Sequence, residues 1–400
     1  MQGPPFNVAR GHGLMTKVNE SGYAGFEQGP IRPPSEAQSL LIRVSRNCPW
    51  NRCTFCPVYK GERFSVRPVA HVMEDIEAVH EQLARIHEIT ARSPSITPAA
   101  LAQTAQGLTT PQKNAFYAAL NWYCEGMESI FLQDANSLII KPADLIAILE
   151  HIRRRFPWVK RITSYARSHT VARIADQDLA AMQQAGLSRI HIGMESGSDA
   201  VLEKVCKGTT KAQHVKAGIK VRQAGIELSE YIMPGLGGVE LSTDHARESA
   251  DALNQINPHF IRLRTLAIPP GTPLFDDFTS GRFVPMKDAE VAAEVLLFIE
   301  SLNGITSTIK SDHILNLFED LEGRMPQDKE KMARVVRSFL EMDPRRRTLY
   351  QVGRRVGVFR GLEDMSDPRR LAHAQGVVDQ YGITPENVDQ TIIEIMRRFV

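Results

Sequence analysis

The sequence predicts an α/β fold in which short buried strands alternate with amphipathic helices. Six apolar runs, each five to seven residues long and rich in Ile, Val, Leu or Phe, have the composition of strands. They are Leu40–Ser45, Ser129–Gln133, Val159–Ser164, Arg189–Met194, Glu227–Met233 and Phe260–Leu266. The last five begin roughly 30 to 40 residues apart, which is the length of one βα unit. Such alternation demands a parallel sheet, so the six units form either a complete or partial barrel or a doubly wound sheet.

Amphipathic helical stretches fill the intervals between these strands. They are Val72–Ile89, Pro142–Phe156, Asp176–Gly186, Thr210–Gly225 and Leu241–Ile256. One interval is too long for a single unit, because residues 90–128 add two predicted helices, Thr97–Gln106 and Thr110–Trp122, on either side of a polar joint at Gly107. We interpret this segment as a helical insertion, which serves either packing or a role as a lid or partner surface.

The two ends of the chain differ from the predicted barrel, which occupies residues 39–310. Residues 1–38 are rich in Gly, Pro and polar side chains and read as an extended lead-in. From residue 311 the pattern is helical only, so 311–400 are predicted to form a C-terminal helical module. This module has six arginines between Asp343 and Glu363 with no acidic residue among them: Arg345, Arg346, Arg347, Arg354, Arg355 and Arg360. They form either a patch for RNA or phosphate or a solvated helix face.

Composition narrows the functional classes. The chain has 48 basic and 46 acidic residues, a net charge of +2, which gives no argument for nucleic acid or an anionic membrane. No apolar run approaches the roughly 18–20 residues of a membrane span, and the N-terminus lacks the layout of a signal peptide. Five cysteines in such a chain indicate a reducing compartment. We therefore expect a cytoplasmic protein without a membrane partner.

Three of the five cysteines, Cys48, Cys53 and Cys56, lie within nine residues on the loop after the first predicted strand. In α/β barrels, residues at this end of the strands carry the chemistry. Three thiolates on one loop match an iron–sulfur site that leaves one iron of a four-iron cube open to a small molecule. A zinc site is the alternative, and it lacks an obvious fourth ligand because the nearest downstream histidine is His71.

The run Cys48…Cys53-Thr54-Phe55-Cys56 resembles the cysteine motif of the radical S-adenosylmethionine (radical SAM) superfamily, which has an aromatic residue before the last cysteine. The first gap here is four residues rather than three, and one bulged residue around Pro49 and Trp50 would absorb the difference. The resemblance covers about residues 40–285. Within the superfamily, the sequence is similar to the Elongator/methylthiotransferase/coproporphyrinogen-oxidase-like branch. It implies a partial (β/α)6 barrel of the TIM type.

The resemblance also implies the cofactors. In this family a [4Fe–4S] cluster, here on Cys48, Cys53 and Cys56, binds S-adenosylmethionine (SAM) through its open iron. One electron, from a donor of the flavodoxin or ferredoxin type, cleaves SAM to methionine and a 5′-deoxyadenosyl radical that abstracts hydrogen from the substrate. Phe55 would shield the cluster from water, which such chemistry must exclude.

Polar residues after the second and third strands are candidates for SAM contacts. Asp134 and Asn136 stand where the family often has Gly-Gly-Glu, so either one accepts from the SAM amino group or the pair forms an Asx turn. Arg167 would pair with the SAM carboxylate, and Ser164 would reach a ribose hydroxyl. The alternative for Arg167 is a solvated side chain.

The later strands add further candidates. Gly-x-Glu195-Ser196-Gly is a familiar element of the same family branch, where the Glu and Ser lie near SAM. Lys207 stands where relatives often carry Arg, and it is a second candidate for the carboxylate. Gly235 and Gly237 resemble a glycine-rich element whose backbone approaches the adenine, although glycines also make tight turns.

Arg262 and Arg264 alternate with apolar residues on the sixth strand and therefore share one face. They indicate either an anionic ligand, meaning substrate or the SAM carboxylate, or ion pairs inside the barrel.

Taken together, the sequence predicts a radical SAM enzyme acting on a small or medium metabolite. One alternative is a radical SAM enzyme that modifies RNA through the Arg345–Arg360 segment, and another is a zinc-stabilised binding protein without enzymatic activity. The sequence names no catalytic residue beyond these cofactor ligands.

Overall fold

The computed structural model describes residues 22–396, so the first 21 residues of the predicted lead-in lie outside the described part. Its main sheet has eight strands in the order β1-β4-β5-β6-β7-β8-β9-β10. The bounds are β1 Leu40–Arg43, β4 Ser129–Gln133, β5 Arg161–Ala166, β6 Leu187–Glu195, β7 Glu227–Ile232, β8 Phe260–Leu263, β9 Thr308–Lys310 and β10 Gly323–Arg324. Neighbours from β1 to β9 are parallel, while β10 is antiparallel to β9. β1 and β10 form the two open edges, so the barrel is partial.

All six predicted strands are present and lie in chain order in the sheet, which confirms the predicted partial barrel. The expectation that the chain is helical only from residue 311 was wrong, because β10 joins the sheet at Gly323–Arg324 through β9. Strands of two or three residues are too short to produce a hydrophobic period, which is why the pattern did not reveal them.

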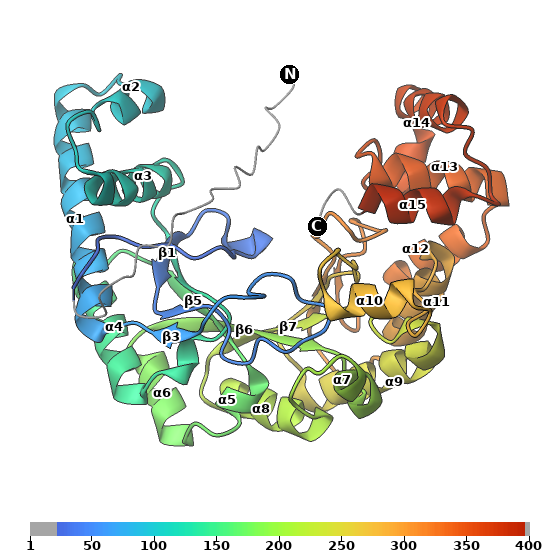
Figure 1. Ribbon diagram of the computed structural model, residues 1–400, viewed down its shortest axis with the longest axis horizontal. Coiled ribbons are helices and arrows are strands. Elements are labelled where there is room, and N and C mark those ends of the chain that lie inside the picture. The colour runs from blue at the N-terminus through green and yellow to red at the C-terminus, as the bar shows by residue number, and fades with distance from the viewer. Residues whose placement is uncertain (1–21, 397–400) are drawn as a thin grey trace.

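Helices that connect the barrel strands cover the outer face of the sheet, and further helices lie beyond its two edges (Figure 1). Their bounds are α1 Val69–Arg92, α2 Pro98–Gln103, α3 Thr110–Cys124, α4 Pro142–Arg155, α5 Ser168–Val171, α6 Asp176–Gln184, α7 Asp199–Lys204, α8 Lys211–Gln223, α9 Gly238–Ile256, α10 Pro273–Thr279, α11 Asp288–Ser301, α12 Lys329–Leu340, α13 Pro344–Arg355, α14 Pro368–Gln380 and α15 Val388–Met396. None of the described helices has the length and apolar character needed to cross a membrane.

The predicted insertion forms α2 and α3 against α1, on the opposite side of the molecule from α12–α15 (Figure 1). Thr109 precedes α3, and its backbone N–H donates to Gln112 Oε1 at 3.0 Å, while Pro111 fits the first turn, where no backbone donor is needed. Phe116 and Trp122 are buried on the inner side of α3. The insertion therefore packs on the barrel, while the division into a lead-in, a barrel and a C-terminal module stays a prediction.

The two faces of the sheet differ in chemistry. Residues such as Ile130, Ile162, Ile190, Leu228 and Ile261 are fully buried in the core that the sheet shares with the helices. The alternate residues point to the other face, the barrel lumen. The lumen is aromatic and polar, because the rings of Phe131, Tyr165, His191 and Tyr231 contact one another across β4 to β7, with centroids 5.2 to 5.7 Å apart for adjacent rings.

A short 3-10 turn of the lead-in, η1 (Pro34–Glu36), contacts the lumen at the end where the strands begin. Glu36 is fully buried and accepts hydrogen bonds from Ser39 Oγ at 2.6 Å and from Arg161 Nη2 at 3.3 Å. It also lies 3.4 Å from His191 Nε2. Although burial opposes its charge, these partners lower the pKa of Glu36. The lead-in thus contributes a buried carboxylate to this end of the barrel and leaves the other end for chemistry.

Candidate cluster and cofactor site

The three cysteines lie on a loop, residues 47–64, that is clamped at its base by strands β2 (Ser45–Arg46) and β3 (Ser65–Val66). Strand β2 follows β1 directly, so the loop begins at the end of the barrel where the parallel strands finish. Two backbone hydrogen bonds fix its middle: Thr54 N–H donates to Val205 O at 3.0 Å, and Leu274 N–H donates to Thr54 O at 3.1 Å. The cysteine loop is therefore tied both to the end of α7 and to the start of α10.

The three thiols are free, half-buried and close enough to influence one another's ionisation. Burial raises the pKa of the Cys53 thiol, and the charges of Lys207 and Arg167 partly oppose that rise. Burial likewise raises the pKa of Cys56, with Lys207 again opposing. The cations that favour thiolates here come from the loops after β5 and β6.

The three cations that lie near the cysteines in the sequence, Arg46, Arg52 and Lys60, have other partners. Arg46 Nε is bound to Glu27 at 2.7 Å. Lys60 Nζ donates to the Asn51 carbonyl at 3.1 Å, and the Arg52 guanidinium lies over the Trp50 ring at 5.1 Å. Neighbours along the chain are thus not the charges that act on the thiols in space.

Trp50, in the four-residue gap between Cys48 and Cys53, is another link from the loop to the barrel. Its Nε1–H donates to Cys206 O at 2.7 Å, and its ring lies 5.0 Å from the Arg167 guanidinium. A Cβ at Gly208 would fall 2.3 Å from the indole, so the ring needs a glycine there. Asn51 absorbs the extra length with a left-handed backbone, φ 47°. Sequence reasoning placed the bulge here but missed what the indole does.

Beside the thiols lies an ion pair between Glu195 and Lys207, with Lys207 Nζ 3.0 Å from Glu195 Oε1. Burial opposes the charge on Lys207, but Glu195 and the Cys53 thiolate outweigh it and raise its pKa. Lys207 Nζ also lies 5.9 Å from the Phe55 ring, which is buried in a small apolar cluster that Cys53 and Cys56 contact. The structure therefore brings together Phe55, Glu195 and Lys207 at the cysteines, as the sequence suggested.

Arg167 also belongs to this group. Its Nη2 donates to Lys207 O at 2.7 Å, and the charges of the Cys48 and Cys53 thiolates act on it. Burial lowers the pKa of Arg167. Asn136 supports this arrangement from below, because its Oδ1 accepts from the Arg167 backbone N–H at 3.1 Å and its Nδ2 donates to Thr170. The alternative of a solvated Arg167 was wrong.

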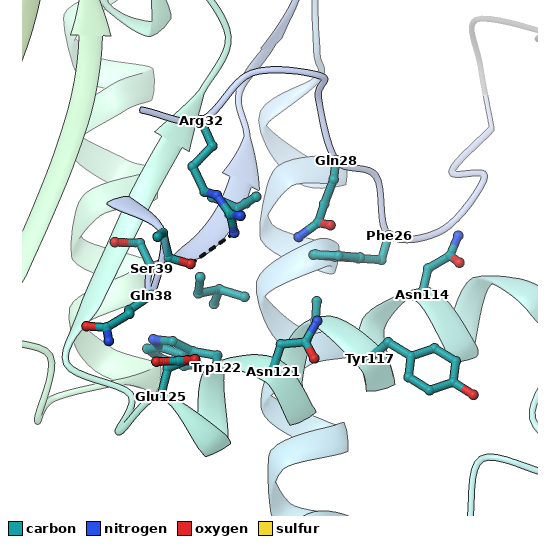
Figure 2. Close-up of a pocket in the computed structure, with 14 residues that line it drawn as sticks. Phe26, Gln28, Arg32, Gln38, Ser39, Asn114, Tyr117, Asn121, Trp122 and Glu125 are labelled. Carbon is teal, nitrogen blue, oxygen red and sulfur yellow. Dashed lines mark hydrogen bonds between the residues drawn. The ribbon is translucent and has the colours of Figure 1, made fainter. Parts of the chain in front are cut away.

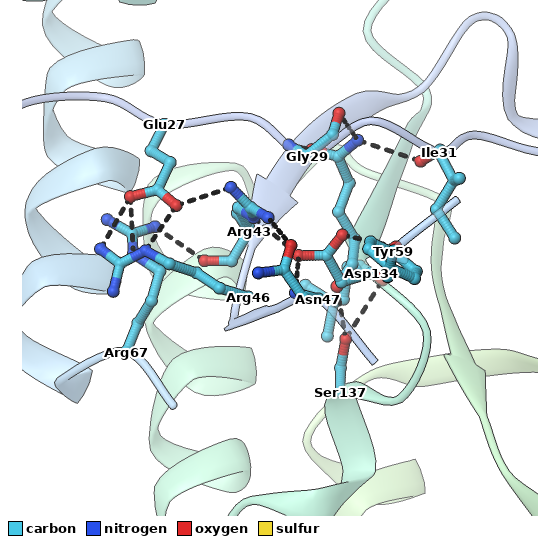
Figure 3. A network of polar contacts seen from close by, with 12 residues as sticks. Glu27, Gly29, Ile31, Arg43, Arg46, Asn47, Tyr59, Arg67, Asp134 and Ser137 are labelled. Atoms are coloured by element: carbon cyan, nitrogen blue, oxygen red, sulfur yellow. Dashed lines mark hydrogen bonds and ion pairs between the residues drawn. The ribbon is translucent and has the colours of Figure 1, made fainter. Parts of the chain in front are cut away.

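Asp134 is fully buried at the end of β4, with φ 72°, and both its carboxylate oxygens are engaged (Figure 3). Oδ2 accepts from Arg43 Nε at 2.6 Å and from Asn47 N–H at 3.2 Å. Oδ1 accepts from Tyr59 OH at 2.8 Å. Asn47 and Tyr59 stand at the two ends of the cysteine-bearing segment, so Asp134 ties that segment to β1 and β4.

The structure does not bring four other predicted residues to the thiols. Ser164 alternates with the lumen-facing Tyr165 and is buried on the helix side. The Ser196 hydroxyl is buried between His245 Nδ1, at 2.8 Å, and the Ser198 N–H. The Gly235 N–H donates to Glu294, and Gly237 caps α9 with an ordinary backbone. Their roles as SAM contacts stay predictions.

The predicted arginine patch of the C-terminal helices is divided between the surface and the interior. Arg354 and Arg355 are only 4 and 5% exposed. Arg355 pairs with Asp288 at 2.6 Å and Arg354 with Glu319 at 3.5 Å. Only Arg345, Arg346 and Arg360 are exposed. The reading of six arginines on one surface was therefore wrong.

A cavity of about 410 Å³ lies elsewhere, between the lead-in, the start of β1 and α3 (Figure 2). Phe26, Tyr117 and Trp122 line it together with polar side chains that include Arg32 and Glu125. It holds none of the cysteines or their charged neighbours.

The residues around the cysteines fit an anionic cluster with a zwitterionic ligand beside it. Three thiols, two cations and one carboxylate converge there, shielded by Phe55. No group of three or more His, Cys, Asp or Glu side chains in the described part of the chain could hold a single metal ion. A [4Fe–4S] cube binds each cysteine through a different iron and so spreads its ligands more widely than one ion does.

Comparison with known proteins relates the middle of the chain to one superfamily. Residues 114–249, from α3 into α9, match the model of the radical SAM superfamily. The tRNA uridine(34) acetyltransferase of Methanocaldococcus jannaschii is 22% identical over 128 residues, which are 32% of this chain and 24% of that protein. The chain thus spans about a quarter of that curated relative. The matched family segment begins after the cysteine loop.

Two solved structures are similar at a low level. The radical SAM methyltransferase TsrM from Kitasatospora setae has a TM-score of 0.42 and 15% identity, over 61% of this chain and 37% of that chain. Coproporphyrinogen III oxidase (HemN) from Escherichia coli has a TM-score of 0.42 and 12% identity, over 72% and 56%.

Residues 114–249 match the radical SAM superfamily, which is the family that the cysteine motif and the order of the strands resemble. Proteins of this superfamily are enzymes whose cofactors are a [4Fe–4S] cluster and SAM, as the sequence predicted for this chain.

Proposed function

We propose that Cys48, Cys53 and Cys56 hold the [4Fe–4S] cluster, and that the enzyme abstracts hydrogen from a small or medium metabolite. The convergence of these three thiols with Lys207 and Arg167 carries the proposal. When bound, the cluster and SAM supply reductive cleavage of SAM to a 5′-deoxyadenosyl radical, with an electron from a donor of the flavodoxin or ferredoxin type.

The residues of this chain then have separate roles. Arg167, held by the Lys207 carbonyl and the Trp50 ring, presents a cation for the SAM carboxylate. Glu195, paired with Lys207, presents a carboxylate beside the thiols for the SAM amino group or ribose. Phe55 and its apolar neighbours keep water from the thiols. Asp134 holds the loop in place, and its contact with SAM stays a prediction.

A metabolite is favoured over RNA as substrate by the side chains that line the lumen and by the charge distribution. The lumen is lined by aromatic rings and contacted at the far end by the lead-in with Glu36. Two of the six arginines proposed for RNA are buried in ion pairs.

RNA modification remains the second candidate, because the curated relative named above is a tRNA-modifying enzyme. RNA that co-purifies with the protein and resists a salt wash would support this candidate. The exposed arginines of the C-terminal helices, Arg345, Arg346 and Arg360, would then be the expected contacts of that RNA.

The test is anaerobic reconstitution followed by reaction with dithionite and SAM. We expect iron and sulfide to bind the wild type and 5′-deoxyadenosine to form. Cys53→Ala should lose both, whereas Cys124→Ala, at an exposed cysteine of α3, should keep both. A protein that binds zinc but no iron, or one with an intact cluster that forms no 5′-deoxyadenosine, would contradict the proposal.

A further inference from the structure

The two arginines of β8 and its end have different partners. Both lie on the lumen side, since Arg262 is in register with Tyr231 of β7 and Arg264 follows two residues later. Arg262 is buried and its Nη1 lies 2.5 Å from Asp312 Oδ2. The internal ion pair considered for the sixth strand is thus formed by Arg262 alone.

Arg264 is exposed at the mouth of the barrel. Its backbone N–H donates to Ile232 O at 2.9 Å, which fixes it beside the end of β7. No carboxylate of the described residues lies within ion-pair distance of its guanidinium, whereas Arg262, two residues earlier, is neutralised. An arginine held over a lumen without a counter-ion is an electrostatic site for an anion.

The surroundings of Arg264 complete a binding surface. Its charge acts on the hydroxyls of Tyr165 and Tyr231, whose rings lie 6.4 Å apart in the lumen. His313, brought over from the segment after β9, is also within range of this charge. Burial, with Arg264 adding to it, lowers the pKa of His313 to about 4, so its imidazole is neutral at pH 7. Among the residues that the structure describes, Arg264 is thus a cation without a carboxylate partner. Two tyrosine hydroxyls and one neutral imidazole are its neighbours.

The position of Arg264 separates it from the SAM-side charges. Glu195 ends β6 and pairs with Lys207, whereas Arg264 follows β8, and β7 lies between them. Tyr165 is within electrostatic range of both Glu195 and Arg264. A molecule that reaches from Arg264 across Tyr231 to Tyr165 would thus approach the Glu195 side of the barrel mouth.

We propose that the substrate is a small molecule with a carboxylate or phosphate group, which Arg264 binds at the barrel mouth while the rest of the molecule lies on Tyr165 and Tyr231. That the bound anion is a substrate rests on the proposed function. Anion binding itself can be measured without catalysis.

The experiment measures the binding of two probes, benzoate and inorganic phosphate, to the full chain by ligand-observed NMR titration. We compare the wild type with Arg264→Gln, with Arg264→Lys, and with Arg345→Gln as a control at an exposed arginine of α13. At least one probe should bind the wild type and the Arg345→Gln control with equal affinity. The same probe should bind Arg264→Gln about tenfold more weakly or worse, and Arg264→Lys should recover part of the lost affinity. Preference for benzoate would assign a carboxylate substrate, and preference for phosphate would assign a phosphorylated one.

Other results would overturn the assignment. Equal affinity of the wild type and Arg264→Gln for a probe would place the anion site elsewhere. If neither probe bound the wild type, the proposed anion site at Arg264 would be refuted. Displacement of the probe by a short oligouridylate but not by free phosphate would assign the site to RNA.

SAM measurements separate this inference from the proposed function. Arg264→Gln should keep the SAM affinity and the substrate-free 5′-deoxyadenosine formation of the wild type. Loss of SAM affinity would mean that Arg264 binds the SAM carboxylate and would overturn the inference. If the wild type binds the probe through Arg264 but forms no 5′-deoxyadenosine, the proposed function fails while the anion site stands.

Discussion

Replacing Asp134 by Asn tests how the cysteine loop is held. The side chain is fully buried and accepts hydrogen bonds from Arg43, Asn47 and Tyr59 (Figure 3). Asparagine has nearly the same shape but carries no charge, and it puts an NH₂ group where one carboxylate oxygen accepted. At least one of the three donors then faces another donor.

The expected cost follows from the geometry. Removing one partner of a buried ion pair costs about 3 to 5 kcal/mol. Arg43 keeps its second carboxylate, Glu27, at 2.8 Å, so we expect a loss near the lower end, about 3 kcal/mol. Because Asn47 and Tyr59 flank the cysteines, much of this loss should appear as local opening of residues 47–64 rather than as global unfolding.

The assay combines urea denaturation, hydrogen exchange of the cysteine loop in the metal-free protein, and iron content after reconstitution. Asp75→Asn is a matched control, because Asp75 is also fully buried, pairs with Arg67 at 2.5 Å and accepts from Tyr23 OH at 2.8 Å. Both variants should lose global stability. Only Asp134→Asn should show faster exchange in the loop and lower iron content.

Tyr59→Phe provides a second, milder perturbation, since it removes one hydrogen bond to Asp134 and costs about 1 kcal/mol. It should shift loop exchange in the same direction by a smaller amount. If Asp134→Asn and Asp75→Asn had equal loop exchange and equal iron content, Asp134 would be merely structural. If Asp134→Asn kept its iron but lost SAM affinity, the residue would be a SAM contact after all.

Three further predictions concern other parts of the molecule. Trp50→Leu removes the ring that supports Arg167, so we expect the cluster to be retained and SAM to bind severalfold more weakly in equilibrium dialysis. His214 is buried with both ring nitrogens unpartnered, and burial lowers its pKa from 6.5 to about 3, so the unfolded chain binds the extra proton and stability falls as pH drops below about 6.5. The wild type should lose about 2 kcal/mol more than His214→Leu between pH 7 and 5 in urea denaturation. Glu36→Ala leaves Arg161 without its buried carboxylate and should lower the stability by about 3 kcal/mol, with a lower melting temperature in calorimetry.

The fold was predictable because each barrel strand carries its own signal. Runs such as Ser129–Gln133 have an apolar centre and are buried along their whole length, as expected for strands covered on both faces, and the helices between them have a regular amphipathic period. The same rule explains the failures. Strand β10 owes its existence to pairing with β9 and not to its own two residues. Such pairing is a tertiary effect that a local pattern does not contain.

The sequence predicted several side chains that gather near the cysteines, but sequence neighbours were a poor guide to the cations that act on the thiols. The cysteines, Glu195 and Lys207 follow a family motif and the order of the strands, and the structure places them together. Arg46 and Lys60 lie close to the cysteines in sequence, yet they are used to hold Glu27 and Asn51. Sequence distance is a poor guide to electrostatic neighbours when a loop folds back on itself.

The unusual four-residue gap between Cys48 and Cys53 has a structural purpose in this chain. The additional length lets Trp50 reach the loop after β6, where it donates to Cys206 O and lies against Arg167. A shorter gap would leave Arg167 with backbone carbonyl partners but no ring beneath it. Burial disfavours the charged form of the Arg167 guanidinium. The face of the Trp50 ring and the nearby Cys48 and Cys53 sulfurs stabilise that charged form. The departure from the usual spacing and the position of the predicted carboxylate-binding arginine are thus two aspects of the same packing arrangement.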